Sequence, residues 1–272
     1  MKTRQILLTN DDGIESPGLL AAAAALSELG YVTVAAPRGQ FSGAGRSLPK
    51  NSDGIIELRK AGVNGQTWTV FAVGGTPAQT VLHGVLEILS EPPDLVVSGI
   101  NYGENLGTGI TASGTIGAAL EAASLGLRSL AVSLETEQRH HHSHSAEVDF
   151  STAAYFTTLF ARLMLSMRLP EDVDVLKVDV PCDATPATPW EVTRLSHKSY
   201  YVPTRPQRAS WDTPGTPGYR VQEQLKDDVE GTDVYALHVK RVVAVTPLSL
   251  DMTSRVSLEE LGRLFRAGQA DS

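Results

Sequence analysis

The sequence predicts an α/β fold with an open, mostly parallel sheet. Short apolar runs alternate with helix-forming segments between residues 6 and 180, which is the pattern of β-α-β units. Polar, glycine-rich stretches follow several of these runs, and open α/β sheets bind ligands at the edge where such loops leave the strands. Because prolines crowd the chain after residue 182 and the alternation stops, we expect an α/β core over residues 1–182 and an extension over residues 183–272.

The first predicted strand ends in an acidic cluster. An apolar run over residues 6–9 is followed by four polar or flexible residues, Asn10, Asp11, Asp12 and Gly13. A run of this length with a turn signal behind it is typical of a buried strand. Ser16 suits the cap and Pro17 the first position of a helix that continues to residue 29.

Two adjacent carboxylates favour a metal site at this edge of the sheet. Asp11 and Asp12 repel each other, and no basic residue lies beside them in the sequence. A divalent cation would remove that cost, since hard cations take oxygen ligands. The alternative is an Asx-type turn closed by Asn10 and Asp11, but a turn needs one such residue rather than three.

The second predicted strand, over residues 31–36, ends at Pro37. A polar, glycine-rich loop over residues 38–47 follows it. A right-handed β-α-β crossover would bring this loop to the same edge of the sheet as Asp11. Ser42 could therefore offer a hydroxyl to the same metal, or it could be an ordinary loop serine.

A predicted hairpin then interrupts the α/β pattern. Residues 55–58 and 66–72 have strand character on either side of a turn at residues 64–65. A helix is expected to begin near Pro77 and to continue to residue 89.

The loop after the predicted strand over residues 94–98 is the second informative stretch. Residues 99–115 contain five glycines with Asn, Ser and Thr, and a helix is predicted over residues 116–125. The free N–H groups and the positive dipole end at a helix start can hold an anion. The loop lacks the lysine of a Walker motif and the third glycine of a dinucleotide fingerprint, and a plain connecting loop is the alternative.

Histidines gather in the next loop. A strand is predicted over residues 129–134 and a helix over residues 148–167, and between them lie His140, His141, His142 and His144. Histidine-rich runs can bind transition metals. We nevertheless expect residues 135–147 to be a polar surface loop, because they lie outside the two informative loops. Residues 175–180 are expected to be the last strand of the core.

The carboxyl-terminal extension is expected to be a β-rich arm. Strand character appears at residues 191–195, 220–223, 233–238 and 241–246, and an amphipathic helix at residues 258–266. The extension also contains five aromatic side chains that need burial, those of Trp190, Tyr200, Tyr201, Trp211 and Tyr219. An arm that packs on the core or on another subunit would bury them.

Composition limits the functional classes. A formal net charge of -8 argues against broad nucleic-acid binding by a basic surface. Cys182 is the single cysteine, so no intrachain disulfide can form and a reducing compartment fits. The run at residues 6–8 is too short for a signal-peptide core, and no run approaches the ~20 apolar residues of a spanning helix. We therefore expect a cytoplasmic protein without stable nucleic-acid or membrane partners.

Several separate stretches resemble the signature blocks of the SurE family, the survival protein E nucleotidases. In chain order they are residues 10–13, Ser42-Gly43, residues 98–107 and Ser113-Gly114-Thr115. The family's carboxyl-terminal block is similar to residues 231–233, 246–248 and 251–253. The resemblance thus extends from residue 6 to residue 253.

The resemblance implies a metal-dependent phosphatase site. One divalent cation, Mg²⁺ or Mn²⁺, would be bound by four side chains, those of Asp11, Asp12, Ser42 and Asn101. Substrate and phosphate would be held by Asn10, Asn105, Ser113, Gly114 and Thr115. The implied reaction hydrolyses nucleoside 5′- and 3′-monophosphates through attack by a metal-activated water, with a side activity on polyphosphate. Asp11 or Asp12 could take the proton of that water or only hold the metal.

The resemblance also implies an architecture and an assembly. The fold would be a three-layer α/β/α sandwich with a Rossmann-like core, and homodimers or homotetramers would exchange their carboxyl-terminal arms. The rival functional class is a sensor that binds a nucleotide or phosphate without hydrolysing it. The paired carboxylates favour an enzyme, because a pure anion binder should not place two negative charges beside its ligand.

Three features depart from the family pattern. Ala78-Gln79 stands where many members carry an aspartate and a cysteine. Lys177-Val178-Asp179-Val180-Pro181 replaces the more usual Asn-x-Asn-x-Pro, and the histidine run is particular to this chain. These departures bear on substrate preference and local packing more than on the metal site.

Overall fold

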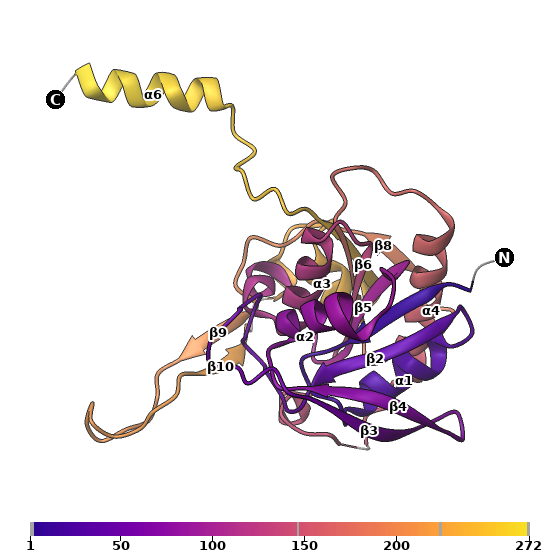
Figure 1. Cartoon of the computed structure of the whole chain (residues 1–272). Coiled ribbons are helices and arrows are strands. Elements are labelled where there is room, and N and C mark those ends of the chain that lie inside the picture. Colours follow the sequence, from indigo (N-terminus) through magenta and orange to yellow (C-terminus); the bar gives the residue numbers. More distant parts are fainter. Residues whose placement is uncertain (1–2, 146, 223–224, 271–272) are drawn as a thin grey trace.

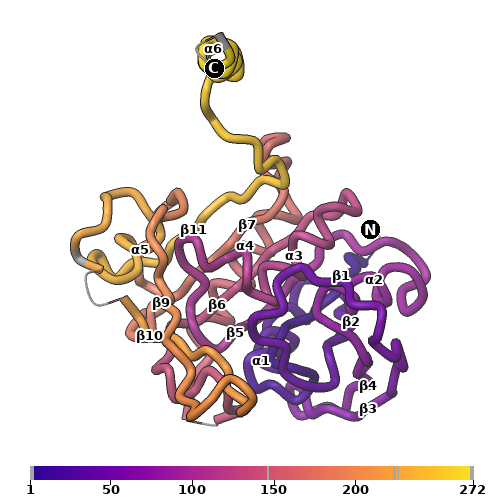
Figure 2. Tube along the Cα trace, turned by 90° about the vertical axis from the view of Figure 1, so that its left-hand side faces the viewer, coloured from indigo at the N-terminus to yellow at the C-terminus, as the bar shows by residue number. Residues whose placement is uncertain are grey.

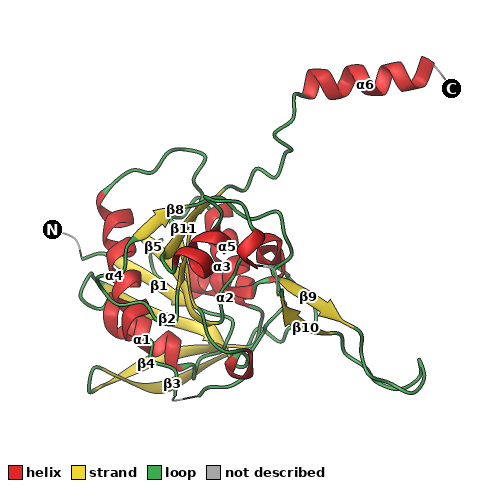
Figure 3. Cartoon of the chain, turned by 180° about the vertical axis from the view of Figure 1, so that it is seen from behind, coloured by secondary structure: helices red, strands yellow, loops and turns green. Residues whose placement is uncertain are grey.

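The computed structural model describes residues 3–145, 147–222 and 225–270 and has the predicted α/β architecture. Within this part of the chain, a nine-stranded sheet carries helices on both faces (Figure 1, Figure 3). Its strands lie in the order β3 (Ile56–Val63), β4 (Gln66–Val73), β2 (Tyr31–Pro37), β1 (Gln5–Thr9), β5 (Leu95–Tyr102), β6 (Ser129–Leu134), β7 (Val175–Val180), β11 (Val243–Leu248) and β8 (Trp190–Val192). The pairs β3–β4 and β11–β7 are antiparallel, and the other neighbours are parallel.

The central strand β1 contributes to two hydrophobic layers. Side chains alternate across a strand, so Leu8 packs with α1 (Pro17–Leu26) and α4 (Ser151–Ser166). Leu7 faces the opposite way and packs with α2 (Pro77–His83) and α3 (Gly114–Ser124). Both leucines are fully buried, and each stabilises the fold by about 2 kcal/mol. The result is the expected three-layer α/β/α sandwich.

Helix starts follow local capping chemistry. Ser113 caps α3 by accepting a hydrogen bond from the Ile116 amide at 3.2 Å. Thr76 caps α2 in a capping box with Gln79. Ser16 occupies the cap position of α1, as predicted, but its buried hydroxyl has no hydrogen-bond partner among the described residues. Helix α1 therefore starts without side-chain capping.

Short helical turns complete the connections. The described residues include η1 (Gly84–Ile88), η2 (Gly107–Ala112), η3 (Gln138–His140), η4 (Leu225–Asp227), α5 (Asp233–Tyr235) and η5 (Ala236–Lys240). None of the described helices combines the length and the apolar content that a membrane span requires.

Two predictions about strands are wrong. Residues 175–180 are not the last strand of the core, because β11 pairs with β7 and β8 pairs with β11 in the same sheet. Residues 233–238 form the helical turns α5 and η5 instead of a strand. Their short apolar run is compatible with a strand or a helix, and Thr232 decides for the helix, because its side chain accepts a hydrogen bond from the Tyr235 amide.

The carboxyl-terminal segment leaves the sandwich in two places. A hairpin of β9 (Tyr201–Thr204) and β10 (Gly218–Val221) extends from one side (Figure 1). Helix α6 (Leu258–Ala270) stands apart from the body at the end of an extended segment (Figure 2). Tyr200 is buried beside the hairpin, whereas Trp211 at its tip is 90% exposed.

Candidate active site

Three loops meet around the carboxyl end of β1. This strand lies between β2 and β5, so the loops that follow these strands leave the same edge of the sheet. The Phe41 amide donates to the Asp11 carbonyl at 2.7 Å, and the Tyr102 amide donates to the Asp12 carboxylate at 3.2 Å. The acidic turn, the 38–47 loop and the end of β5 are therefore in direct contact.

Asp11 lies against the start of α3. Its Oδ1 accepts a hydrogen bond from the Thr115 hydroxyl, and the side chain is almost fully buried. Burial raises the pKa of Asp11, although the bonds from Thr115 and from the Gly114 backbone partly offset this. A Cβ atom on Gly114 would lie 2.7 Å from the Asp11 Cβ and 2.8 Å from its Oδ2, so this carboxylate and the helix start fit only without a side chain there.

Asp12 is the more perturbed of the two carboxyl groups. It is 1% exposed, and its second oxygen accepts a hydrogen bond from the Gln40 amide at 3.2 Å. Burial and the nearby charge of Asp11 raise the pKa of Asp12 well above its ordinary value. No ion pair joins Asp11 or Asp12 to a cationic side chain among the described residues. Two buried, unpaired carboxylates fit a divalent cation, which would offset both burial and repulsion.

Two further oxygen donors lie near this pair. Asn101 donates its amide N–H groups to the carbonyls of Gly103 at 2.7 Å and Tyr102 at 3.3 Å, which leaves its carbonyl oxygen free to accept. Ser42 is exposed and follows Phe41, whose amide contacts the Asp11 backbone. A set of carboxylate, amide and hydroxyl oxygens suits Mg²⁺ or Mn²⁺.

Asn10 closes the acidic turn. Its Oδ1 accepts from the Gly13 amide at 3.1 Å, and its Nδ2 donates to the Gly13 carbonyl at 3.2 Å. The side chain has no exposed surface. Asn10 thus closes the turn, while the Asp11 carboxylate faces α3 through Thr115.

Asn105 and the first turn of α3 carry the residues predicted to hold the phosphate. The Asn105 side chain donates to the Ser133 hydroxyl at 2.8 Å, and its backbone amide donates to Asp179 at 2.7 Å. Ser113 and Thr115 lie at the first turn of α3, where the one caps the helix and the other contacts Asp11. The Thr115–Asp11 contact therefore links one residue predicted for the phosphate to one predicted for the metal.

The histidine loop lies on the acidic turn. The Gln40 amide donates to the His141 carbonyl at 2.6 Å as well as to Asp12. A His144 ring nitrogen lies 3.0 Å from the Asp12 carbonyl oxygen. Residues 135–147 lie outside the two informative loops in the sequence, and folding brings them into contact with the acidic turn. Gln40 and His144 were missed because these contacts join residues 28 to 132 positions apart, and no local pattern reports them.

The β9–β10 hairpin borders the same region. The Tyr219 ring stacks on His141, with 2.9 Å between the Tyr219 hydroxyl and a ring nitrogen. The Tyr201 hydroxyl donates to the Glu104 carbonyl at 3.0 Å, and Tyr200 donates to the Glu104 carboxylate. Burial raises the pKa of Glu104 to about 7. The extension thus contacts the loop that follows β5 and carries Asn105.

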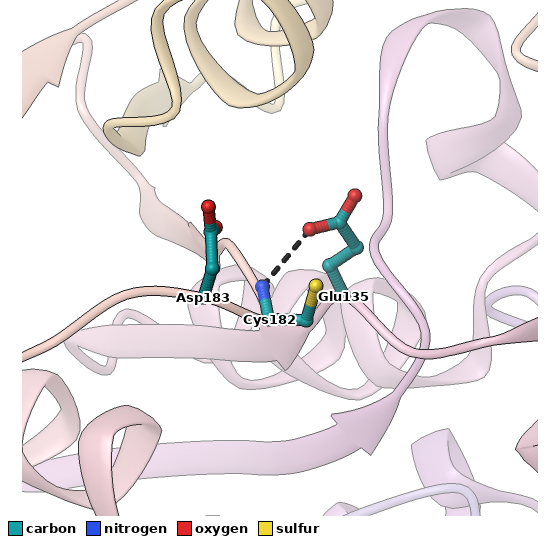
Figure 4. A group of neighbouring side chains, drawn as sticks. All are labelled: Glu135, Cys182 and Asp183. Carbon is teal, nitrogen blue, oxygen red and sulfur yellow. Dashed lines mark hydrogen bonds between the residues drawn. The ribbon is translucent and has the colours of Figure 1, made fainter.

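A second acidic group has a different character. Glu135, Cys182 and Asp183 place one ligand atom each within 4.8 Å of one another (Figure 4). The Arg241 guanidinium, however, donates to Glu135 at 2.6 and 3.0 Å and to Asp183 at 2.6 Å. A cation already neutralises these carboxylates, so the group is an ion-pair cluster that ties β11 to the ends of β6 and β7.

The chain is similar to one protein family throughout its core. The family model described as Survival protein SurE matches residues 6–202. A curated protein of Thermococcus gammatolerans named 5′-nucleotidase SurE is 46% identical over 258 residues, which cover 94% of each chain. A protein of the same name from Archaeoglobus fulgidus is 44% identical over 257 residues, which cover 94% of this chain and 95% of the other. The crystal structure of SurE protein from Aquifex aeolicus superposes with a TM-score of 0.76 at 33% identity, covering 96% and 99% of the two chains.

Proposed function

The chain belongs to the survival protein SurE family, and from this premise we propose that it is a metal-dependent 5′-nucleotidase. It would hydrolyse nucleoside monophosphates to a nucleoside and inorganic phosphate. The observation that carries the proposal is the pair of buried carboxylates, Asp11 and Asp12, beside the start of α3. The curated relatives named 5′-nucleotidase cover nearly the whole chain.

Four side chains would hold one Mg²⁺ or Mn²⁺ ion: Asp11, Asp12, Asn101 and Ser42. A bound cation supplies charge that polarises phosphoryl oxygens and lowers the pKa of a bound water. A phosphate at the start of α3 would lie beside the Asp11 carboxylate, because Thr115 and Gly114 already contact that group. Without a cation the two negative charges would repel each other, which supports metal dependence.

The residues of the chain would divide the remaining work. Asn10 would hold the turn that presents Asp11 and Asp12, since its side-chain Nδ2 and Oδ1 both form hydrogen bonds with the Gly13 backbone. Asn105 and the backbone at Ser113, Gly114 and Thr115 would orient the phosphate, and donors there would stabilise charge on its oxygens during transfer. Either aspartate could accept the proton of the attacking water.

The proposal extends to features of substrate range, assembly and location. Hydrolysis of 3′-monophosphates and a side activity on polyphosphate are part of it. So are a homodimer or homotetramer with exchanged carboxyl-terminal arms and a cytoplasmic location without stable nucleic-acid or membrane partners. Support for the assembly comes from α6, which stands apart from the body with Leu264 and Phe265 more than 60% exposed.

The decisive experiment is a phosphate-release panel over 5′- and 3′-monophosphates and polyphosphate with Mn²⁺, Mg²⁺ or a chelator. The wild-type chain should release phosphate from 5′-monophosphates only with metal. Asp11→Asn should lower kcat at least about a hundredfold, because a metal ligand and a charge are lost. Asp172→Asn is the matched control, since Asp172 is exposed, accepts from the Ser249 hydroxyl at 2.8 Å and lies outside the family's signature blocks. Full metal-dependent turnover by the Asp11→Asn variant would contradict the assignment of the metal site to Asp11.

The second candidate is a nucleotide or phosphate sensor. The capped start of α3 favours it, because such helix starts bind anions without further chemistry. Calorimetry on the wild-type chain would decide in its favour if nucleotides bound tightly and no metal gave phosphate release. The buried carboxylate pair supports the enzyme.

A further inference from the structure

A buried ion-pair network lies behind the loop that carries Asn105. Lys177 and Asp179 are two positions apart in β7, so their side chains share one face of the sheet. The Lys177 ammonium bonds the Asp179 carboxylate and lies 3.2 Å from Asp233 at the start of α5. All three side chains have no exposed surface.

Both carboxylates of this network also hold the backbone of one loop. Asp179 accepts from the Asn105 amide at 2.7 Å, and Asp233 accepts from the Gly107 amide at 3.0 Å. The Asn105 side chain adds a third anchor through Ser133, which lies directly beside Asp179 across the β6–β7 pair. Lys177 therefore joins the two carboxylates that hold the backbone of this loop at Asn105 and at Gly107.

Stability alone gives a weak reason for such a network. Burying charges costs several kcal/mol per ion, and well-packed apolar residues often stabilise a core at least as well. Charge-assisted hydrogen bonds, in contrast, are short and directional and hold groups at defined positions. Burial alone would lower the pKa of Lys177, but Asp179 and Asp233 outweigh it and raise that pKa. The ammonium is thus charged and can orient both carboxylates.

We propose that Lys177, Asp179 and Asp233 are positioning residues that set the phosphate-binding geometry of Asn105. They contact neither Asp11 nor Asp12 and act through the backbone of residues 105–107. The inference rests on the proposed function, because Asn105 is assigned there to the phosphate.

A matched pair of double variants tests the proposal. Lys177→Met/Asp179→Leu removes the ammonium and the acceptor of the Asn105 amide together, so no lone buried ammonium remains. Lys177→Met/Asp179→Asn places a side chain of the same branched shape at position 179 but keeps an oxygen acceptor for the Asn105 amide. These double variants are named the leucine pair and the asparagine pair after the residue at position 179. They have a similarly branched side chain there and differ in whether the Asn105 amide has an acceptor.

Inorganic phosphate is the probe, used as a competitive inhibitor of the Mn²⁺-loaded enzyme. The leucine pair should raise its Ki about tenfold or more, the cost of losing one hydrogen bond to a charged group. The asparagine pair should stay within about threefold of wild type. The Mn²⁺ concentration for half-maximal activity should not change in either. Thr157→Val, which removes a buried hydrogen bond within α4, controls for destabilisation alone.

Amide hydrogen exchange supplies a readout that does not depend on activity. The leucine pair should speed exchange at Asn105 and Gly107 relative to α4, and the asparagine pair should not. Equal Ki values for phosphate in the two pairs, or unchanged exchange in residues 105–107, would overturn the positioning role. If the wild-type chain neither hydrolysed nucleotides nor bound phosphate, the proposed function would be wrong. Hydrogen exchange would still show whether the network holds the backbone of residues 105–107. Should loss of Lys177 unfold the chain, Asp179→Leu and Asp179→Asn alone repeat the comparison.

Discussion

At the scale of single residues, the candidate site depends on how closely groups approach each other. Asp11 and Asp12 were recognisable in the sequence because adjacent carboxylates after a strand are unusual in a simple turn. Their partners were only partly recognisable. Thr115 was chosen through the family resemblance, whereas Gln40 contacts Asp12 across 28 positions without any local signal. Functional residues that are adjacent in the sequence can therefore be predicted, whereas contacts between residues far apart in the sequence cannot.

Gly114 gives a prediction about this close packing. Gly114→Ala should lower kcat about tenfold, because overpacking of this kind costs 1–3 kcal/mol and a Cβ there would lie 2.7 Å from the Asp11 Cβ. Steady-state kinetics with Mn²⁺ would measure the loss. Gly62→Ala is the control, since a Cβ at that position meets no atom within 4 Å. Equal activity of the two variants would show that Asp11 tolerates displacement.

Glu104 gives a prediction about pH. Its pKa rises from 4.5 to about 7 in the folded chain, so the folded state binds the proton more tightly than the unfolded state. Protonated Glu104 therefore stabilises the folded state fully below pH 4.5. This contribution to the free energy of unfolding, about 3 kcal/mol, is lost as the pH rises to about 7. Asp11 and Asp12 act in the same direction in the metal-free chain.

The measurement is urea unfolding in chelator at pH 5, 6, 7 and 8. Glu104→Gln should flatten the decline in unfolding free energy between pH 5 and 7, because an amide cannot titrate but can still accept the Tyr200 hydrogen bond. A variant whose decline matched that of the wild type would assign the pH dependence to the other buried carboxyl groups with raised pKa values, Asp11, Asp12 and Asp179.

At the scale of elements, local signals identified most strands and helices but not their neighbours. The hairpin β3–β4 and helices α1 to α4 follow from apolar runs, turns and caps. The place of β11 in the sheet depends on pairing with β7, which lies 63 or more residues earlier in the chain. No local pattern in residues 243–248 specifies that partner. The α5 turn was missed because the short apolar run after Thr232 is as typical of a strand as of a helix, and only the Thr232 cap distinguishes the two.

The histidine loop gives a prediction at this scale. Gln40→Ala should weaken activation by Mn²⁺ about tenfold, since residues that orient metal ligands typically contribute that much to affinity. The physical reason is that Gln40 holds both Asp12 and the His141 carbonyl. Titration of activity with Mn²⁺ would measure it, with Gln66→Ala in the exposed end of β4 as the control. An unchanged midpoint would leave Asp12 oriented by the Tyr102 amide alone.

At the scale of the whole molecule, the sandwich buries its core while the carboxyl-terminal arm exposes apolar groups. Leu258, Leu264 and Phe265 on α6 are each more than 60% exposed. Large apolar side chains exposed together on one helix are typical of an interaction site. The aromatic composition of the extension predicted an arm, but sequence alone gave no indication that α6 stands apart from the body (Figure 2).

The assembly gives the corresponding prediction. Light scattering at micromolar concentration should report a mass of at least two chains, and removal of residues 257–272 should weaken the association. Phosphate release by the truncated chain is the control for folding, because α6 contacts no site residue in the described structure. A monomeric mass for the full-length chain would contradict the proposal that subunits exchange their carboxyl-terminal arms.

Cys182 makes the arrangement of such an assembly measurable without any substitution. It is exposed and is the single cysteine in the sequence, so a thiol-reactive spin label would attach once to each chain. Burial and the neighbouring Glu135 raise the pKa of its thiol, and labelling should therefore be faster at alkaline pH. Dipolar coupling between labels would arise only where two copies meet. Its distance distribution would distinguish a dimer, with one separation, from a tetramer with several.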